Sequence, residues 1–345
     1  MKITLASYLG VMLIHGGPTV QIMETYHHLR NEGIEVELYD QWASLNTILN
    51  SDLFHLFAAN MDTFGLARHL YQRNKPFVVS PIFYTRRSSK TVRRICQLDQ
   101  ITRKIHRGLW WDYGFRRDIC EWAEKVLPNT SEEAQLIHEG LGIPREKITV
   151  VPNGVSKMFA EADPVLFKKE YGLENFILNV GHIGPDRKNM LALVKALAKI
   201  DHRAVIIGRI TRSPETEQVL AEVRKNKNIL LIEGLDHDSP LLASAYAACD
   251  VFALPSKFET PGIAALEAAL AGAKIVITPY GGTRDYFQDM AIYVDPYSVE
   301  SIRAGIIQAL DTPPNSRLRQ HILDNYTWDK IALKTLSVYR EVLSG

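Results

Sequence analysis

The sequence lacks several features that define membrane and secreted proteins. Only three of its 345 residues are cysteine, and Cys96, Cys120 and Cys249 stand far apart, so neither a disulfide framework nor a zinc site is expected. No run of about 20 apolar residues occurs, so no transmembrane helix is predicted. The apolar stretch that starts at Ile3 ends before Ser7, which is too short for the core of a signal peptide. These absences predict a cytoplasmic protein.

The chain also lacks a large net charge of either sign. The chain has 40 Lys and Arg residues against 39 Asp and Glu residues, which leaves a net charge of +1. A basic field over the whole molecule is therefore absent, and nucleic acid is not expected as a partner. The hydrophobic share of 46% and the charged share of 23% are ordinary for a globular protein. At roughly 100–200 residues per domain, the length predicts two domains.

Short apolar runs alternate with amphipathic segments of helical length along the whole chain. This alternation predicts βαβ units and parallel sheets. The pattern restarts near residue 176, so the expected fold class is α/β with two doubly wound, Rossmann-like domains. The expected strands are 3–6, 34–39, 53–57, 77–80 and 125–127, then 176–180, 204–207, 229–232, 251–254, 274–277 and 292–294. The expected boundaries are 1–155 and 165–325 for the two domains, with a final helix over 326–345 that packs back toward the first domain.

Ligands of open α/β sheets bind at the carboxyl ends of the strands, so the segments that follow strands carry the candidate site. The most informative one, 255–272, reads Pro-Ser-Lys-Phe-Glu-Thr-Pro-Gly-Ile-Ala-Ala-Leu-Glu-Ala-Ala-Leu-Ala-Gly. Thr260 is the predicted N-cap of its helix and Pro261 the predicted first helical residue. The free N–H groups of that helix start suit a phosphate. They belong to Gly262, Ile263 and Ala264.

Two glutamates in this segment call for an explanation. Glu267 lies in a stretch otherwise made of alanine and leucine, which predicts a helix buried on most sides. A carboxylate there needs partners, and a diol such as a ribose would supply them; the alternative is a narrow solvent-facing stripe. Glu259 precedes the helix at the rim of the predicted pocket, or is an ordinary acid of a loop.

A second segment, 179–189, reads Asn-Val-Gly-His-Ile-Gly-Pro-Asp-Arg-Lys-Asn and leads from a strand into a helix. Arg187 and Lys188 at the helix start suit a diphosphate. Gly181 and His182 complete this group of candidates. The segment is not the Gly-x-Gly-x-x-Gly of a dinucleotide site.

These segments resemble the family 4 retaining glycosyltransferases, whose GT-B fold has two facing Rossmann-like domains with a cleft between them. Glu259 and Glu267 match the Glu-x7-Glu pattern of that family in its strand and helix context. His182 and Lys188 match its Gly-Arg…Lys donor-phosphate motif with the same spacing of six. Supporting resemblances are Val-Pro-Asn-Gly-Val at 151–155, Tyr-Gly-Gly at 280–282 and Tyr-Thr-Trp at 326–328.

The resemblance implies transfer of a sugar from a nucleoside-diphosphate sugar to an acceptor hydroxyl, on a lipid-linked or polysaccharide acceptor. It assigns the ribose to Glu267, the donor sugar to Glu259 and the diphosphate to Lys188. The catalytic candidates are Glu259, Lys188 and Arg187. Fixed cations and helix N-termini stabilise the departing diphosphate, so neither a metal nor another cofactor is expected. The first domain then lies on the acceptor side, and the second binds the donor.

The first domain contributes a further resemblance. Ile-His-Gly-Gly-Pro at 14–18 resembles the family's Gly-Gly loop, which faces the donor phosphates, so Gly16 and Gly17 are donor-binding candidates. Two positions depart from the family. His182 stands where arginine is usual, so either Arg187 supplies that charge or the phosphate clamp is weaker. The strand at 77–80 also lacks the histidine that many members carry near the acceptor.

The sequence leaves other functions open. The alternatives are a nucleotide-sugar epimerase or phosphorylase on the same scaffold, and a non-catalytic, two-lobed sugar- or nucleotide-binding protein. The Glu-x7-Glu segment in its strand and helix context favours the transferase.

The near-neutral total charge conceals one basic segment. Residues 86–117 hold ten Lys and Arg residues against Asp99 and Asp112, a net charge of +8. Trp110 and Trp111 lie in the same stretch. Basic residues mixed with tryptophans suit an anionic membrane surface, so a peripheral location on the inner face of a membrane is a further expectation. The alternatives are a solvated helical face with a few acceptor contacts and, less favoured, a single-stranded nucleic-acid groove.

Overall fold

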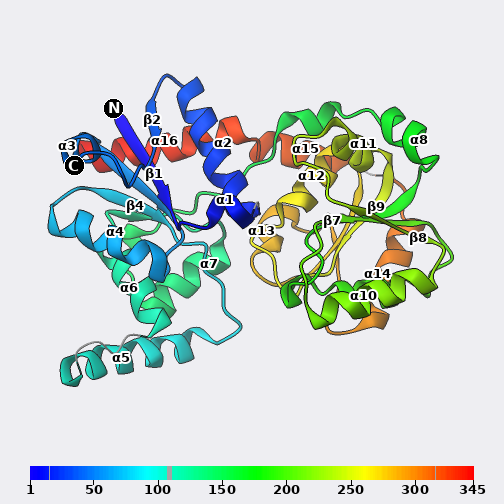
Figure 1. Cartoon of the computed structure of the whole chain (residues 1–345), viewed down its shortest axis with the longest axis horizontal. Coiled ribbons are helices and arrows are strands. Elements are labelled where there is room, and N and C mark those ends of the chain that lie inside the picture. Colours follow the sequence, from blue (N-terminus) through cyan, green and yellow to red (C-terminus); the bar gives the residue numbers. More distant parts are fainter. Residues whose placement is uncertain (15, 107–110, 315) are drawn as a thin grey trace. The chain divides into compact units, whose positions relative to one another are not determined.

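The computed structural model describes residues 1–14, 16–106, 111–314 and 316–345. His15 of the predicted Gly-Gly loop, and Arg107 and Trp110 of the basic segment, lie outside the described residues. The chain divides into two compact units (Figure 1). Unit 1 comprises Met1–Gly154 and Trp328–Gly345, and unit 2 comprises Val155–Thr327.

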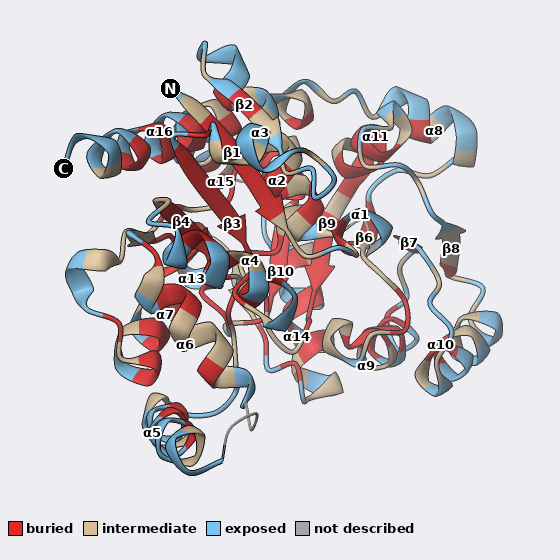
Figure 2. Ribbon diagram, turned by 60° about the vertical axis from the view of Figure 1, so that its left-hand side comes forward, coloured by how far each residue is buried: buried red, intermediate tan, exposed pale blue. Residues whose placement is uncertain are grey.

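Unit 1 is built on a parallel sheet with the order β2-β1-β3-β4-β5 over its described residues. Its strands are β1 (Lys2–Ser7), β2 (Glu35–Leu38), β3 (Leu53–Phe57), β4 (Phe77–Ser80) and β5 (Lys125–Val126). The central strands β3 and β4 are buried at every residue, as expected for a parallel sheet with helices on both faces (Figure 2).

Helices cover both faces of this sheet. They are α1 (Val11–Ile14), α2 (Gly17–Asn31), α3 (Leu45–Leu49), α4 (Met61–Gln72), α5 (Ser89–Ile105), α6 (Asp112–Trp122), α7 (Ser131–Gln135) and α16 (Trp328–Ser344), with the short turns η1 (Leu136–Leu141) and η2 (Arg145–Lys147). One core cluster joins the sheet to α2 and α16, and the other joins it to α4, α6 and η1. Helix α5 packs against η1 and α6.

Unit 2 contains a parallel sheet with the order β11-β10-β9-β6-β7-β8 over its described residues. Its strands are β6 (Phe176–Val180), β7 (Ala204–Gly208), β8 (Ile229–Glu233), β9 (Cys249–Leu254), β10 (Lys274–Ile277) and β11 (Ile292–Tyr293). The order changes direction around β6 and β9, and the carboxyl ends of such central strands are where doubly wound sheets bind ligands.

The helices of unit 2 also lie on two faces. They are α8 (Val165–Tyr171), α9 (Met190–Leu197), α10 (Pro214–Lys225), α11 (Pro240–Ala248), α12 (Ile263–Ala271), α13 (Thr283–Phe287), α14 (Val299–Asp311) and α15 (Ser316–Asn325), with the turns η3 (Lys157–Glu161) and η4 (Asp186–Lys188). Helices α11 and α12 share one apolar core cluster, and α9 and α14 share the other.

The predicted α/β class and the two parallel sheets are confirmed, and every expected strand is present within two residues of its bounds. The segment 156–164, expected between the domains, lies in unit 2. So does Val155, which was expected in the first domain, and the side chains of Val155 and Phe159 are buried in the core of unit 2. Helix α16 lies in unit 1 and packs against α2. In the described part of the chain, no helix is long and apolar enough to cross a bilayer.

Candidate functional site

The loop after β6 is tied to two other loops at the same edge of the sheet. Asn189 follows η4 with a left-handed backbone (φ 55°) and a buried side chain. Its Nδ2 donates to the carbonyl of Pro255, after β9, at 2.9 Å and to that of Pro296, after β11, at 2.6 Å. This clamp fixes the position of Arg187 and Lys188, which immediately precede Asn189.

The structure brings three predicted residues into one ion-pair cluster. Lys188 Nζ lies 2.7 Å from Glu259 Oε1, and Arg187 Nη1 lies 3.2 Å from Glu259 Oε2. Arg187 also donates to the carbonyl of Phe258 at 3.3 Å and lies over its ring. The carboxylate of Glu259 is almost fully buried, whereas Arg187 is 40% exposed, so the cluster opens toward solvent on the arginine side.

The electrostatics of this cluster favour the ionised carboxylate. Burial alone would raise the pKa of Glu259, but the charges of Lys188 and Arg187 together outweigh burial and lower that pKa to about 2. Burial lowers the pKa of Lys188 from its ordinary value, and the Glu259 carboxylate opposes that change. Glu259 therefore stays anionic at any physiological pH.

Two backbone contacts hold Glu259 in place. Its N–H donates to the carbonyl of Tyr280 at 3.0 Å. At the next residue, a Cβ added to Gly281 would lie 2.3 Å from the carbonyl oxygen of Glu259, so the two backbones approach as closely as glycine allows. The Tyr-Gly-Gly turn is thus a structural support of Glu259.

The start of helix α12 differs from the prediction. Thr260 was expected as N-cap and Pro261 as the first helical residue, but the helix begins at Ile263 with Gly262 as N-cap. Gly262 has a φ of 88°, and a Cβ there would lie 3.1 Å from Leu254 Cδ2, so glycine at this position sets where the helix starts. Ala265 N–H already bonds to the carbonyl of Gly262. The first N–H groups of the helix, those of Ile263 and Ala264 among them, have no carbonyl of their own helix to bond to.

Glu267 is held by two side chains that the sequence analysis did not identify. Tyr246 Oη donates to Glu267 Oε2 at 2.7 Å, and His237 Nε2 lies 2.6 Å from Oε1. Glu267 and Tyr246 are buried, while the side chain of His237 is 41% exposed. Burial, reinforced by the neighbouring carboxylate, raises the pKa of Tyr246 well above its ordinary value, so its hydroxyl remains a donor. The solvent-stripe alternative for Glu267 is therefore wrong.

The remaining predicted residues lie in two places. Gly181 immediately follows β6 and lies next to Lys188, since a Cβ there would lie 3.9 Å from Lys188 Cδ. His182 is the next residue and is partly exposed. In unit 1, Gly16 is the N-cap of α2 and Gly17 its first residue, so the Gly-Gly pair forms a helix start.

The chain contains an Asp-x-Asp triplet, Asp236-His237-Asp238, beside Glu267. Such spacing can hold a metal ion. The expectation that no metal is needed overlooked this triplet. Asp236 and Asp238 are exposed. Among the described residues, no group of three or more His, Cys, Asp or Glu side chains is arranged to hold a metal.

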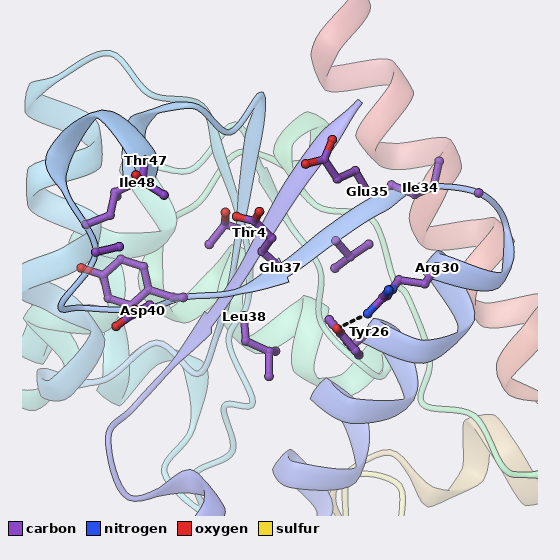
Figure 3. Close-up of a pocket in the computed structure, with 14 residues that line it drawn as sticks. Thr4, Tyr26, Arg30, Ile34, Glu35, Glu37, Leu38, Asp40, Thr47 and Ile48 are labelled. Atoms are coloured by element: carbon purple, nitrogen blue, oxygen red, sulfur yellow. Dashed lines mark hydrogen bonds between the residues drawn. The ribbon is translucent and has the colours of Figure 1, made fainter.

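Two cavities lie away from these carboxylates. One of about 850 Å³ runs along the edge strand β2 in unit 1 (Figure 3). Its acids Glu35 and Glu37 pair with Lys2, and Arg30 contacts Tyr26. It contains none of the predicted site residues. The other, of about 390 Å³, is lined by Asp186 and Asn189, on either side of Arg187 and Lys188, and by Lys257 among others.

The sequence contains little that would indicate the roles of the residues that were not predicted. Tyr246 lies in the apolar helix α11 and His237 in the loop before it, and nothing in their spacing relates them to Glu267. Asn189 closes the predicted phosphate segment, and its clamp depends on carbonyls more than sixty residues away. A buried glutamate requires donors, but the sequence alone does not say which ones.

These observations define a class of protein: a two-unit parallel α/β fold whose second unit joins cations, a helix start and two buried glutamates. The family described as "Glycosyl transferases group 1" matches residues 166–325. Through this unit, the chain is similar to the group 1 glycosyl transferases, as the motifs of the sequence indicated.

Individual relatives agree with this assignment. The MMP alpha-(1->4)-mannosyltransferase of Mycolicibacterium hassiacum is 25% identical over 68% of this chain and 61% of its own length. The chain covers between 53% and 61% of the first curated relatives. Sucrose-phosphate synthase from Thermosynechococcus elongatus superposes with a TM-score of 0.78 at 18% identity, with full coverage of both chains. Anabaena Alr3699/HepE in complex with UDP superposes with a TM-score of 0.74 at 16% identity, over 99% of this chain and 100% of that one. These similarities confirm the GT-B fold.

Proposed function

We propose that the protein is a retaining glycosyltransferase that moves a sugar from a nucleoside-diphosphate sugar to an acceptor hydroxyl. The observation that carries the proposal is the cluster of the buried Glu259 carboxylate with Lys188 and Arg187, just before α12. A binding protein has little need to keep a buried carboxylate ionised beside two cations. The UDP in complex with Anabaena Alr3699/HepE supports a nucleotide as the donor's leaving group.

The cluster suits the charge changes of glycosyl transfer. As the bond to the diphosphate breaks, negative charge develops on its oxygens and the sugar carbon becomes cation-like. In the proposed mechanism, Lys188, Arg187 and the first N–H groups of α12 receive the diphosphate, since fixed positive groups stabilise developing charge without reorganisation. Glu259 then turns from its lysine partner toward the sugar. All of these groups belong to the chain itself.

Glu267 is the proposed ribose-binding group. A buried carboxylate accepts hydrogen bonds from vicinal hydroxyls, and Tyr246 holds one of its oxygens in place for that task. His237 is on the exposed side of the other oxygen, where the ribose would approach. Gly181 and His182, and in unit 1 Gly16 and Gly17, complete the proposed donor-binding set.

The acceptor side of the proposal concerns unit 1. The basic segment 86–117 would attract an anionic membrane surface electrostatically, which places a lipid-linked or polysaccharide acceptor within reach of a peripheral enzyme. The proposed location is cytoplasmic, on the inner face of the membrane.

Nucleotide-induced thermal stabilisation tests the donor site. Wild type is compared with Glu267→Gln and with Glu300→Gln, a surface control on α14, in the presence of UDP, GDP or ADP. We expect one nucleoside diphosphate to raise the Tm of wild type and of the control but not of Glu267→Gln. If no nucleotide raises the Tm, the donor site is wrong. Release of nucleoside diphosphate from UDP-, GDP- and ADP-sugars then separates a transferase from a binding protein and from an epimerase.

A further inference from the structure

Helix α5 buries only a narrow stripe of its surface. Its buried residues are Val92, Cys96 and Asp99, which are spaced four and three positions apart and face η1 and α6. At 3.6 residues per turn, the residues on the opposite side of the helix face solvent. Figures 1 and 2 both show α5 on the outer side of α6, away from the sheet of unit 1, and Figure 2 shows exposed residues along the helix.

Three large apolar side chains occupy this outward side. Leu98, Ile101 and Ile105 are 51%, 55% and 69% exposed, and their spacing of three and four aligns them in one row, defined here as the α5 ridge. Single exposed apolar residues are ordinary on protein surfaces. A row of three on one helix face marks an interaction surface, because water solvates it poorly.

Basic side chains surround the α5 ridge. The exposed ones in and before α5 are Arg86, Arg87, Lys90, Arg93, Arg94 and Lys104. Two acids of this region are paired with arginines: Asp99 is buried against Arg103 at 2.7 Å, and Asp112 bonds to Arg116 at 3.0 Å. A third, Glu139 of η1, bonds to Ser89 at the start of α5. The outward face of α5 therefore combines an apolar row with an excess of exposed basic side chains, Lys90, Arg94 and Lys104 among them.

We propose that α5 is an interfacial anchor whose ridge inserts Leu98, Ile101 and Ile105 among the acyl chains of an anionic bilayer, while the surrounding Arg and Lys side chains bind lipid phosphates. This inference rests on the membrane part of the proposed function and adds insertion to what charge alone would do. Amphipathic helices with basic and apolar exposed residues lie in the plane of the interface in this way. A second copy of the chain is the poorer occupant, because pairing two such faces would bring like charges together.

Vesicle sedimentation of the full chain tests the proposal. The vesicles are phosphatidylcholine alone or phosphatidylcholine with phosphatidylglycerol, at low and high salt. The ridge variant is Leu98→Gln/Ile101→Gln/Ile105→Gln, and the charge variant is Lys90→Gln/Arg93→Gln/Arg94→Gln. The matched control is Val165→Gln/Leu166→Gln, which removes two exposed apolar residues from α8 in unit 2. Folding is verified by Tm and by the nucleotide-induced shift.

We expect wild type and control to bind the anionic vesicles and to keep part of that binding at high salt. The ridge variant should bind at least about tenfold more weakly, and its residual binding should vanish at high salt. If the ridge variant binds like wild type while the charge variant does not, insertion is wrong and the electrostatic attraction stands. If wild type binds no vesicles, both are wrong; ridge-dependent self-association in sedimentation velocity would then assign the ridge to a second copy. The nucleotide-induced rise in Tm tests the donor site independently of vesicle binding.

Discussion

Lys188 Nζ lies 2.7 Å from Glu259 Oε1, and both side chains are largely buried. The two residues are 71 positions apart and come from the loops after β6 and β9. Removing one partner from such a pair leaves the other as an uncompensated buried charge. The pair is therefore sensitive to substitution from either side.

The first prediction concerns Lys188. Lys188→Ala removes the buried cation that would receive the diphosphate, and we expect donor turnover to fall by roughly two to three orders of magnitude. Initial rates with the donor sugar that wild type accepts measure this. Lys199→Ala, which removes a surface lysine paired with Glu300, serves as control and should keep wild-type rates. Unchanged turnover in Lys188→Ala would contradict the phosphate role.

Most of the fold follows from the sequence because each strand is a short apolar run bounded by turn residues. The pairing of Glu259 with Lys188 was less accessible: spacing placed both at strand ends, but only the order of β6 beside β9 makes them neighbours. Local capping preferences predicted Thr260 as the N-cap of α12, but the helix starts two residues later than predicted. The left-handed backbone of Gly262, and the closeness of Leu254 to the position of its missing Cβ, decide that boundary. Tyr246 and His237 could not be predicted as partners of Glu267, because their contacts with it depend on the packing of α11 against α12.

The second prediction separates positioning from chemistry at Tyr246. Tyr246→Phe removes the hydroxyl that holds Glu267 Oε2 and leaves the ring packing in place. We expect the KM for the donor to rise several-fold with kcat little changed, and stability to fall by about 1 kcal/mol. Tyr326→Phe, which loses a hydroxyl bond to the carbonyl of Asp285 in the same unit, should share the stability loss and keep the wild-type KM. Equal KM values in the two variants would remove Tyr246 from the donor site.

The third prediction uses two glycines with similar backbones. Gly281 and Gly272 have φ values of 94° and 103°, so alanine suffers similar backbone strain at both, about 1 kcal/mol. Only at Gly281 would the new Cβ press on the Glu259 backbone, at 2.3 Å, whereas nothing lies within 4 Å at Gly272. Gly281→Ala should therefore lose most of its activity and Gly272→Ala should keep it. Initial rates measure the activity, and the nucleotide-induced Tm shift of each variant measures donor-site binding. Similar activity in the two variants would show that the close approach does not position Glu259.

The last prediction concerns pH and the buried His55 in unit 1. Its ring bonds to Tyr339 Oη at 2.6 Å and to Ser80 Oγ at 2.9 Å, and burial lowers its pKa from 6.5 to about 3. Between these values the unfolded chain binds a proton that the folded chain does not. The contribution to stability is therefore complete above pH 6.5 and is lost as the pH falls toward 3.

A second buried group acts in the opposite direction, so the His55 effect has to be isolated by comparing two proteins. Burial raises the pKa of Glu133 to about 7, which stabilises the folded chain as the pH falls. Urea unfolding of wild type and His55→Gln at pH 7 and pH 5 cancels the Glu133 contribution. The difference in unfolding free energy, wild type minus variant, should fall by about 2 kcal/mol between the two pH values. A difference that is the same at both pH values would mean that His55 titrates in the folded chain much as it does in the unfolded one.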